Sequence, residues 1–205
     1  MWSGIEEMRK NTKYTAAVDT MGCAVEIAPK KFTKAEKAYH CLVGLMMSSQ
    51  TKDEVTHATL RYLVEERNLS IPTILETKES DLNEWIKKVG FHNKKAVYIK
   101  KTTEQIQTKH NGKVPSSYDD LIALPGVGPK MAHLVLQTAF GKVEGVSVDV
   151  HVHRICNRMR WAGKNYETGK NWKPCSTPGE TAKDLEEWLP KEKWTDINHM
   201  LVGFG

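Results

Sequence analysis

The amino-acid sequence predicts an all-α fold, and three observations support this prediction. Helix-start signals recur, in which a threonine is followed three places later by a glutamate, so that each side chain can satisfy a backbone N–H group of the other. Apolar residues recur at spacings of three and four, and no segment shows sustained alternation of apolar and polar residues. The start signals are Thr33 with Glu36, Thr51 with Glu54, and Thr177 with Glu180.

The apolar spacing places helices along most of the chain. After Thr33, the residues Tyr39, Leu42, Val43 and Met46 mark one buried helix face. A similar face follows Thr51, and Pro178 occupies a first helical position, where its missing N–H group is tolerated. Only residues 145–148 look extended, and residues 163–177 look like a long loop. Further helices are expected over residues 71–76, 81–88, 93–109, 118–124, 129–140, 150–160 and 178–189.

Length and composition narrow the classes of protein. The 205 residues suffice for one domain or two small lobes, and 40% hydrophobic residues with 27% charged residues are ordinary for a globular protein. No apolar run reaches the about 18 residues of a membrane span, and the first residues resemble neither a secretory signal nor a mitochondrial transit peptide. The net charge of +5 is compatible with a polyanionic partner but does not identify one.

The four cysteines do not form a recognisable framework. Cys23, Cys41, Cys156 and Cys175 are widely separated, and no Cys-x-x-Cys pair occurs. This distribution favours reduced cysteines in an intracellular protein. A metal site built from these four residues alone is not expected.

The segment from Leu124 to Gly128 joins two predicted helices and carries the most information. Gly126 and Gly128 allow a sharp turn and let the backbone approach another molecule closely. The helix that follows offers N–H groups and a dipole that attract phosphate. A Leu-Pro-Gly-Val-Gly turn can therefore hold a nucleic-acid backbone, although a tight turn with glycines for geometry alone is the simpler explanation of two glycines by themselves.

Lys130 lies directly after this turn, in the first turn of the next helix. A helix N-terminus disfavours an ammonium ion and helps to keep a fraction of the amine neutral. A neutral lysine can attack carbon and form a Schiff base. The alternative is an ordinary solvated lysine, and its position alone does not decide between the two.

Asp149 lies between β-branched residues just before another predicted helix. The simplest role for it is an N-cap that accepts hydrogen bonds from backbone N–H groups. A catalytic role is compatible with capping, because a cap fixes the position of the carboxylate. Lys130 and Asp149 together supply an amine and a carboxylate.

These residues lie in motifs that resemble the helix-hairpin-helix motif, with its following aspartate, of the endonuclease III family. The resemblance rests on Leu124–Ala132 and Val148–Arg154, and it extends over nearly the whole chain. The other matching segments are Leu45–Asp53, Val89–Ala96, Glu187–Pro190 and Leu201–Gly205.

The resemblance implies a fold of two helical lobes with the active site in the cleft between them. Residues 31–142 would form a six-helix lobe containing the hairpin, and residues 1–30 with 143–205 would form the second lobe. It also implies a bifunctional DNA N-glycosylase and AP (apurinic/apyrimidinic) lyase that removes oxidised pyrimidines, such as thymine glycol, in base excision repair. Lys130 would attack C1′ of a nucleotide flipped out of the duplex, Asp149 would assist, and β-elimination would nick the strand.

The resemblance assigns further residues to DNA binding. Gln50 would enter the gap left by the flipped nucleotide, and Phe91 would act as an apolar wedge. Without the resemblance, Gln50 reads as a polar helix terminus and Phe91 equally well as a core aromatic. His151 would help to position the Asp149 loop or make a local structural hydrogen bond. The hairpin residues assigned to DNA binding are Leu124, Gly126, Val127 and Gly128.

The sequence departs from the family pattern in three places. The family's [4Fe–4S] cluster is held by four closely spaced cysteines that would begin after Gly205, so we expect the chain as given to bind no cofactor and no metal. A cluster is expected only if residues beyond Gly205 exist. Val150 stands where the family often has threonine, and the loop over residues 163–177 looks expanded.

Alternative functions follow from these departures. A helix-hairpin-helix module that binds DNA but is catalytically impaired is the main alternative, because the cluster loop is missing. A monofunctional adenine glycosylase is less favoured, because its lysine position usually holds another residue, and a purely structural helical protein is least favoured. The implied partner is double-stranded DNA with a damaged base or an abasic site, bound by a monomer with no membrane partner, and the eukaryotic form of the resemblance implies nucleus and mitochondrion.

Overall fold

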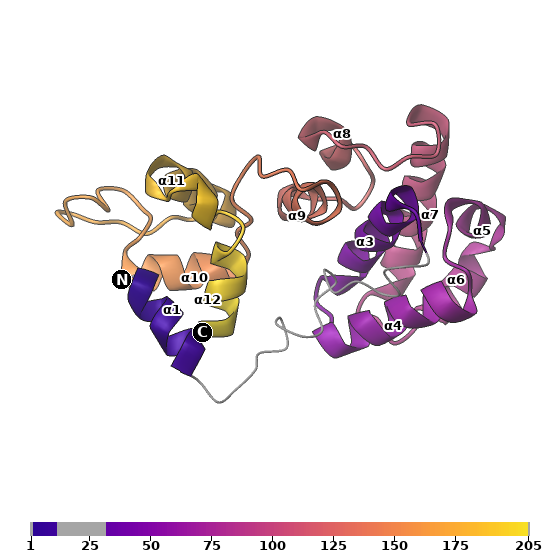
Figure 1. Ribbon diagram of the computed structural model, residues 1–205, viewed down its shortest axis with the longest axis horizontal. Coiled ribbons are helices and arrows are strands. Elements are labelled where there is room, and N and C mark those ends of the chain that lie inside the picture. Colours follow the sequence, from indigo (N-terminus) through magenta and orange to yellow (C-terminus); the bar gives the residue numbers. More distant parts are fainter. Residues whose placement is uncertain (1, 12–31, 205) are drawn as a thin grey trace. The chain divides into compact units, whose positions relative to one another are not determined.

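The computed structural model describes residues 2–11 and 32–204 and divides the chain between Lys142 and Val143 into two compact units. The hairpin unit comprises residues 32–142, and the terminal unit comprises residues 2–11 with residues 143–204. Over these residues the structure is helical and contains no strand, only an isolated bridge between Lys164 and Lys173 (Figure 1). The all-α prediction is confirmed.

The hairpin unit holds seven helices within its described residues, and the apolar spacing predicted a helix at each of these places, whereas the family resemblance implied six. The helices are α3 (Lys34–Ser48), α4 (Asp53–Glu66), α5 (Ile71–Glu76), α6 (Glu79–Trp85), α7 (His92–Lys109), α8 (Tyr118–Ile122) and α9 (Pro129–Phe140).

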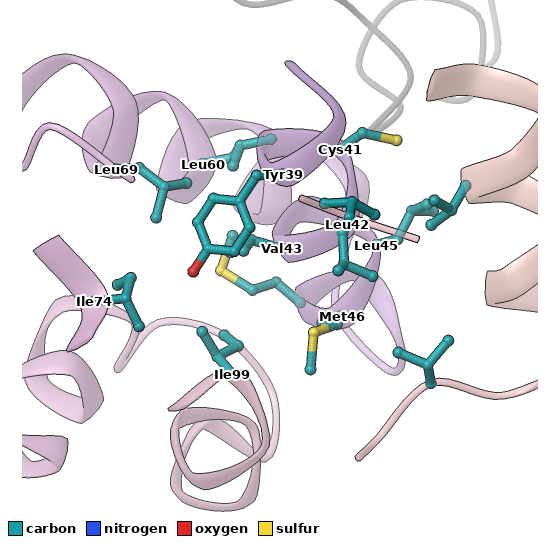
Figure 2. Close-up of a cluster of buried hydrophobic side chains, with 14 of the residues drawn as sticks. Tyr39, Cys41, Leu42, Val43, Leu45, Met46, Leu60, Leu69, Ile74 and Ile99 are labelled. Atoms are coloured by element: carbon teal, nitrogen blue, oxygen red, sulfur yellow. The ribbon is translucent and has the colours of Figure 1, made fainter. Parts of the chain in front are cut away.

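Helix α3 forms the centre of the hairpin unit. It packs against α4, α7 and α9, and ten consecutive residues from Ala38 to Met47 are buried, so the helix is enclosed on all sides. Figure 2 shows Tyr39 directed from α3 toward Ile74 of α5 and Ile99 of α7. The Tyr39 hydroxyl lies 2.6 Å from Thr103 Oγ1 of α7, which satisfies both buried polar groups.

The predicted helix starts are confirmed at two of three positions. Thr33 and Glu36 form a complete capping box at α3, and the Thr177 side chain accepts a hydrogen bond from the Glu180 N–H group. The prediction for Thr51 is wrong, because α4 begins after Lys52 and receives no side-chain cap. The Thr51 hydroxyl is instead occupied by tertiary partners, the Gly90 N–H group and the Lys95 amine.

The terminal unit encloses its own core. Helices α10 and α12 pack together, and α12 also contacts α1, whereas α11 packs on α10. Apolar residues from each of these helices are buried, including Ile5, Val152, Leu185 and Leu201. The helical elements are α1 (Trp2–Asn11), α10 (Val150–Met159), α11 (Pro178–Trp188), the short 3-10 helix η1 (Lys191–Lys193) and α12 (Ile197–Phe204).

Helix ends deviate from the sequence predictions by a few residues. The helix expected over residues 81–88 spans Glu79–Trp85, and that expected over 118–124 ends at Ile122, because the chain turns toward the hairpin. The expected lobe boundary at residues 30 and 31, and Cys23, lie outside the described residues. Among the helices that the structure describes, none has the length and apolar character needed to cross a membrane.

The central position of α3 generates a stability prediction. Leu42 is completely buried, so Leu42→Ala removes packed methyl groups and leaves a cavity, which should lower the free energy of unfolding by about 2–5 kcal/mol. Ile122→Ala, at a side chain that is 40% exposed, should cost less than about 1 kcal/mol. Urea unfolding followed by circular dichroism measures both, and equal losses would show that α3 is not central to stability.

Candidate functional site

The hairpin between α8 and α9 is a tight turn whose shape follows from its sequence. The Val127 N–H group donates to the Leu124 carbonyl at 3.1 Å, and Pro125 and Gly126 occupy the two central positions. Gly126 has a φ of +80°, the left-handed value that the third position of a type II β-turn requires. Leu124 and Val127 are buried in the core, so the exposed Gly126 stands at the tip of an anchored turn.

Helix α7 holds this hairpin along one of its faces. Thr102 Oγ1 donates to the Pro125 carbonyl at 2.7 Å, and Gln105 Nε2 donates to the Ala123 carbonyl at 3.2 Å. A Cβ atom built on Gly126 would lie 2.8 Å from Tyr98 Cγ, so the glycine packs directly on the tyrosine ring. Because residues 98, 102 and 105 share one helix face, α7 fixes the turn at three points.

Lys130 is the second residue of α9 and is half-buried. The positive charge of Lys130 acts on the carboxyl group of Asp53, the first residue of α4. Burial raises the pKa of the Asp53 carboxyl and the Glu54 charge adds to this effect, whereas Lys130 opposes both. Sequence patterns did not pair Lys130 with Asp53, because the two residues are far apart in the chain.

Asp149 belongs to the terminal unit and is the N-cap of α10, as the sequence indicated. Its Oδ1 atom accepts hydrogen bonds from the N–H groups of His151 and Val152, both at 2.8 Å. These two bonds fix the carboxylate at the start of the helix. Val150 beside it is 66% exposed, so the carboxylate stands next to an accessible surface.

His151 contributes to this cap through its backbone, while its side chain is exposed. The next histidine, His153, has a different environment, because its Nδ1 atom lies 2.7 Å from Thr181 Oγ1 of α11. His153 therefore links α10 to α11, whereas the His151 side chain lies on the exposed side of α10.

Gln50 and Phe91 lie on two adjoining loops of the hairpin unit. Both have left-handed backbone conformations, with φ of +51° at Gln50 and +57° at Phe91. Phe91 is 60% exposed, so it is not the core aromatic that the sequence left open. The two residues and Gly126 line a pocket of about 210 Å³, so the structure brings together three of the residues singled out in the sequence.

Lys95 also lines this pocket and was not singled out in the sequence. It sits in the first turn of α7, only 6% of its surface is exposed, and burial lowers the pKa of its amine to about 8. Its Nζ atom donates to carbonyl groups at the end of α3 and to the Thr51 hydroxyl. Nothing in the sequence distinguishes Lys95 from the surface lysines around it.

The described residues contain no group of three or more histidine, cysteine or acidic side chains placed to hold a metal ion. The cysteines in this part of the chain, Cys41, Cys156 and Cys175, are buried thiols, and burial raises the pKa of Cys175 to about 11. Cys41 belongs to the hairpin unit and the other two to the terminal unit. These residues do not fit an iron–sulfur cluster, and the cofactor expectation remains a prediction.

Comparisons with known proteins agree with the fold and the hairpin. Residues 43–191 match the family model described as HhH-GPD superfamily base excision DNA repair protein. The chain is 45% identical over 190 residues to endonuclease III-like protein 1 of Bos taurus, covering 93% of this chain and 59% of that protein. It is 42% identical over 204 residues to endonuclease III-like protein 1 of Gallus gallus, covering 98% and 67%.

A solved structure described as a non-covalent endonuclease III–DNA complex has the same fold, with a TM-score of 0.76 and 26% identity over 100% of this chain and 83% of that chain. The chain therefore belongs to the HhH-GPD superfamily and, within it, to the endonuclease III family. It spans between 51% and 67% of the length of the first four curated relatives it matches.

The hairpin geometry predicts different effects at its two glycines. Gly126→Ala should destabilise the protein by about 1–2 kcal/mol, because the φ of +80° is unfavourable for alanine and the new Cβ meets Tyr98. Gly128→Ala is the control, because Gly128 has a φ of −103° and open space around it. Thermal unfolding measures the difference, and equal melting temperatures for the two variants would contradict the prediction.

Proposed function

We propose that this chain is a bifunctional DNA N-glycosylase and AP lyase of base excision repair that removes oxidised pyrimidines. The observation that carries the proposal is the position of Lys130, an amine in the first turn of the helix that follows a rigid Gly126–Gly128 hairpin, in a member of the endonuclease III family. The exposed glycine at the tip and the N–H groups at the start of α9 are suited to binding a phosphate backbone. Such binding does not depend on the base sequence.

In the proposed reaction, the Lys130 amine attacks C1′ of the flipped nucleotide while the N-glycosidic bond breaks and its electron pair leaves with the base. Asp149 stabilises the positive charge that develops on the sugar and accepts a proton from the attacking amine. The proposal therefore requires Lys130 of the hairpin unit and Asp149 of the terminal unit to act on the same nucleotide.

The nitrogen lone pair then forms a C=N bond to C1′ while the C1′–O4′ bond breaks and O4′ takes up the proton that Asp149 accepted, which opens the sugar ring and gives a Schiff base. This Schiff base makes the C2′ proton acidic. Removal of this proton by a base leaves an electron pair that forms a C2′–C3′ double bond, and the C3′–O bond breaks with the phosphate as leaving group. Hydrolysis of the Schiff base then releases Lys130. No oxidant, reductant or metal ion is needed to balance these steps.

Gln50 and Phe91 complete the proposal. The flipped nucleotide leaves a gap in the duplex, and the exposed Phe91 side chain could partly replace the lost stacking. The Gln50 amide can donate to and accept from the orphaned base. Their adjoining loops and shared pocket support a joint role in the gap.

The proposed partner is double-stranded DNA that carries a damaged base or an abasic site, bound by a monomer with no membrane partner. Relatives from animals, fungi and plants support a eukaryotic DNA-repair enzyme, and the proposal includes residence in nucleus and mitochondrion.

Borohydride trapping tests the lyase chemistry. The protein is mixed with duplex DNA containing thymine glycol, and borohydride reduces any Schiff base to a stable covalent complex. We expect a protein–DNA band for the wild type, none for Lys130→Ala, and an unchanged band for Lys142→Ala, whose amine bonds to the Ser116 carbonyl. A wild-type chain that binds DNA without forming the band would be a binding module, and a band that survives Lys130→Ala would place the nucleophile elsewhere.

Substitutions of Asp149 separate catalysis from helix capping. Asp149→Ser retains an oxygen that can cap α10, so stability should change little, while base release should slow by about 10²–10⁴-fold because the carboxylate is lost. Asp149→Ala should show the same slowing and also lose about 1 kcal/mol of stability. Single-turnover base release and thermal melting give the two readouts, and a fully active Asp149→Ser variant would exclude a catalytic carboxylate at this position.

A further inference from the structure

The Lys95 amine is bonded on both sides of Gln50. Its Nζ atom donates to the Met47 carbonyl at 2.7 Å, to the Ser49 carbonyl at 2.5 Å and to Thr51 Oγ1 at 3.2 Å. An ammonium group has three N–H donors, so these three acceptors use its full capacity. One buried side chain thus holds the residue before Gln50 and the residue after it.

The chain needs such a partner at this place. Helix α3 ends at Ser48, and Ser49 has φ −59° and ψ 126°, so the chain leaves the helix without the left-handed glycine that often satisfies terminal carbonyls. The carbonyl groups at the end of α3 are instead reached by a side chain from α7. Removing that amine would leave a buried carbonyl without a partner, which is unfavourable.

The same network joins the two loops that carry Gln50 and Phe91. The Gly90 N–H group donates to Thr51 Oγ1 at 3.1 Å, and a Cβ atom on Gly90 would lie only 2.3 Å from the Gln50 carbonyl oxygen. The loops therefore touch backbone to backbone. Left-handed conformations at non-glycine residues are strained and persist only where surrounding contacts enforce them.

We propose that Lys95 is the positioning residue for Gln50. Its three hydrogen bonds hold the turn over residues 49–51 against the Gly90 loop, so that Gln50 and Phe91 project together from one surface. The consequence for DNA recognition rests on the proposed function, in which Gln50 enters the gap left by the flipped nucleotide.

Helix α7 supplies a matched control for this inference. Lys100 lies five residues further along and donates to the carbonyl groups of Ile74, Leu75 and Thr77 at the end of α5. Lys100 therefore makes the same kind of hydrogen bonds as Lys95 but shares no acceptor with it. Comparing Lys95→Met with Lys100→Met separates two effects. One is the general effect of losing an amine that bonds to carbonyl groups at a helix end, and the other is the specific effect of losing the amine that holds the Gln50 turn.

Binding to a duplex with a tetrahydrofuran abasic-site analogue tests the proposal. Lys95→Met should weaken binding to this duplex about tenfold, which corresponds to about 1.4 kcal/mol, and should leave binding to undamaged duplex unchanged because the hairpin is intact. Lys100→Met should bind both duplexes as the wild type does. The double variant of Lys95→Met and Gln50→Ala should bind no more weakly than Gln50→Ala alone, because both changes remove one function.

Additive losses in that double variant, or unchanged binding by Lys95→Met, would overturn the positioning role. Circular dichroism and melting confirm that each variant is folded. If Lys95→Met does not fold, Thr51→Val removes one acceptor of the same network while keeping the side-chain shape, and it should weaken abasic-site binding in the same direction.

Hydrogen exchange in the free protein distinguishes failure of this inference from failure of the proposed function. Lys95→Met should accelerate exchange at the Thr51 and Gly90 N–H groups, whose acceptors belong to the turn and its network, whereas Lys100→Met should not. If Gln50→Ala binds the abasic duplex normally, the gap-filling role fails and exchange alone decides the positioning role. Unchanged exchange in Lys95→Met would refute it whatever the DNA result.

Discussion

Polar side chains of α7 satisfy backbone carbonyl groups in three other segments, and the arrangement of the hairpin unit depends on these bonds. Lys95 reaches the end of α3, Lys100 reaches the end of α5, and Thr102 reaches the hairpin. The acceptors of the two lysines lie where α3 and α5 end and leave carbonyl groups without an intrahelical partner, and the acceptor of Thr102 lies in the turn between α8 and α9. Hydrogen bonds from a single helix therefore hold three loops, and two of those loops carry residues that we propose to contact DNA.

Rigid loops suit the proposed recognition of DNA. A residue that replaces a flipped base must be in place before binding, because ordering a loop at that moment subtracts from affinity. The hairpin has its buried anchors Leu124 and Val127, and the Gln50 turn has the Lys95 amine. The same principle operates at Asp149, whose carboxylate is fixed by two backbone N–H groups of the helix that it caps. The residues proposed for DNA recognition and for chemistry are thus held in place by hydrogen bonds or buried anchors close to them.

Local rules predicted the features that depend on neighbouring residues in the chain. The cap at Thr33, the Pro-Gly turn at the hairpin and the cap at Asp149 follow from sequence because their partners lie within a few positions. The cap expected at Thr51 failed because that hydroxyl bonds to Gly90 and Lys95, which are 39 and 44 residues away. Lys95 itself carries no local signal, since burial and three distant acceptors are properties of the folded unit.

At Gln50 and Phe91 the left-handed backbone conformation lowers stability, whereas the side chains serve the proposed recognition of DNA. Glycine at either position would relieve steric strain but would remove the amide or the aromatic ring. Variants enriched from a library only for heat resistance should drift toward glycine or asparagine at these two positions, whereas variants enriched for the proposed activity on damaged DNA should keep their side chains. The two loops are therefore places where directed evolution for robustness and directed evolution for activity would pull the sequence in opposite directions.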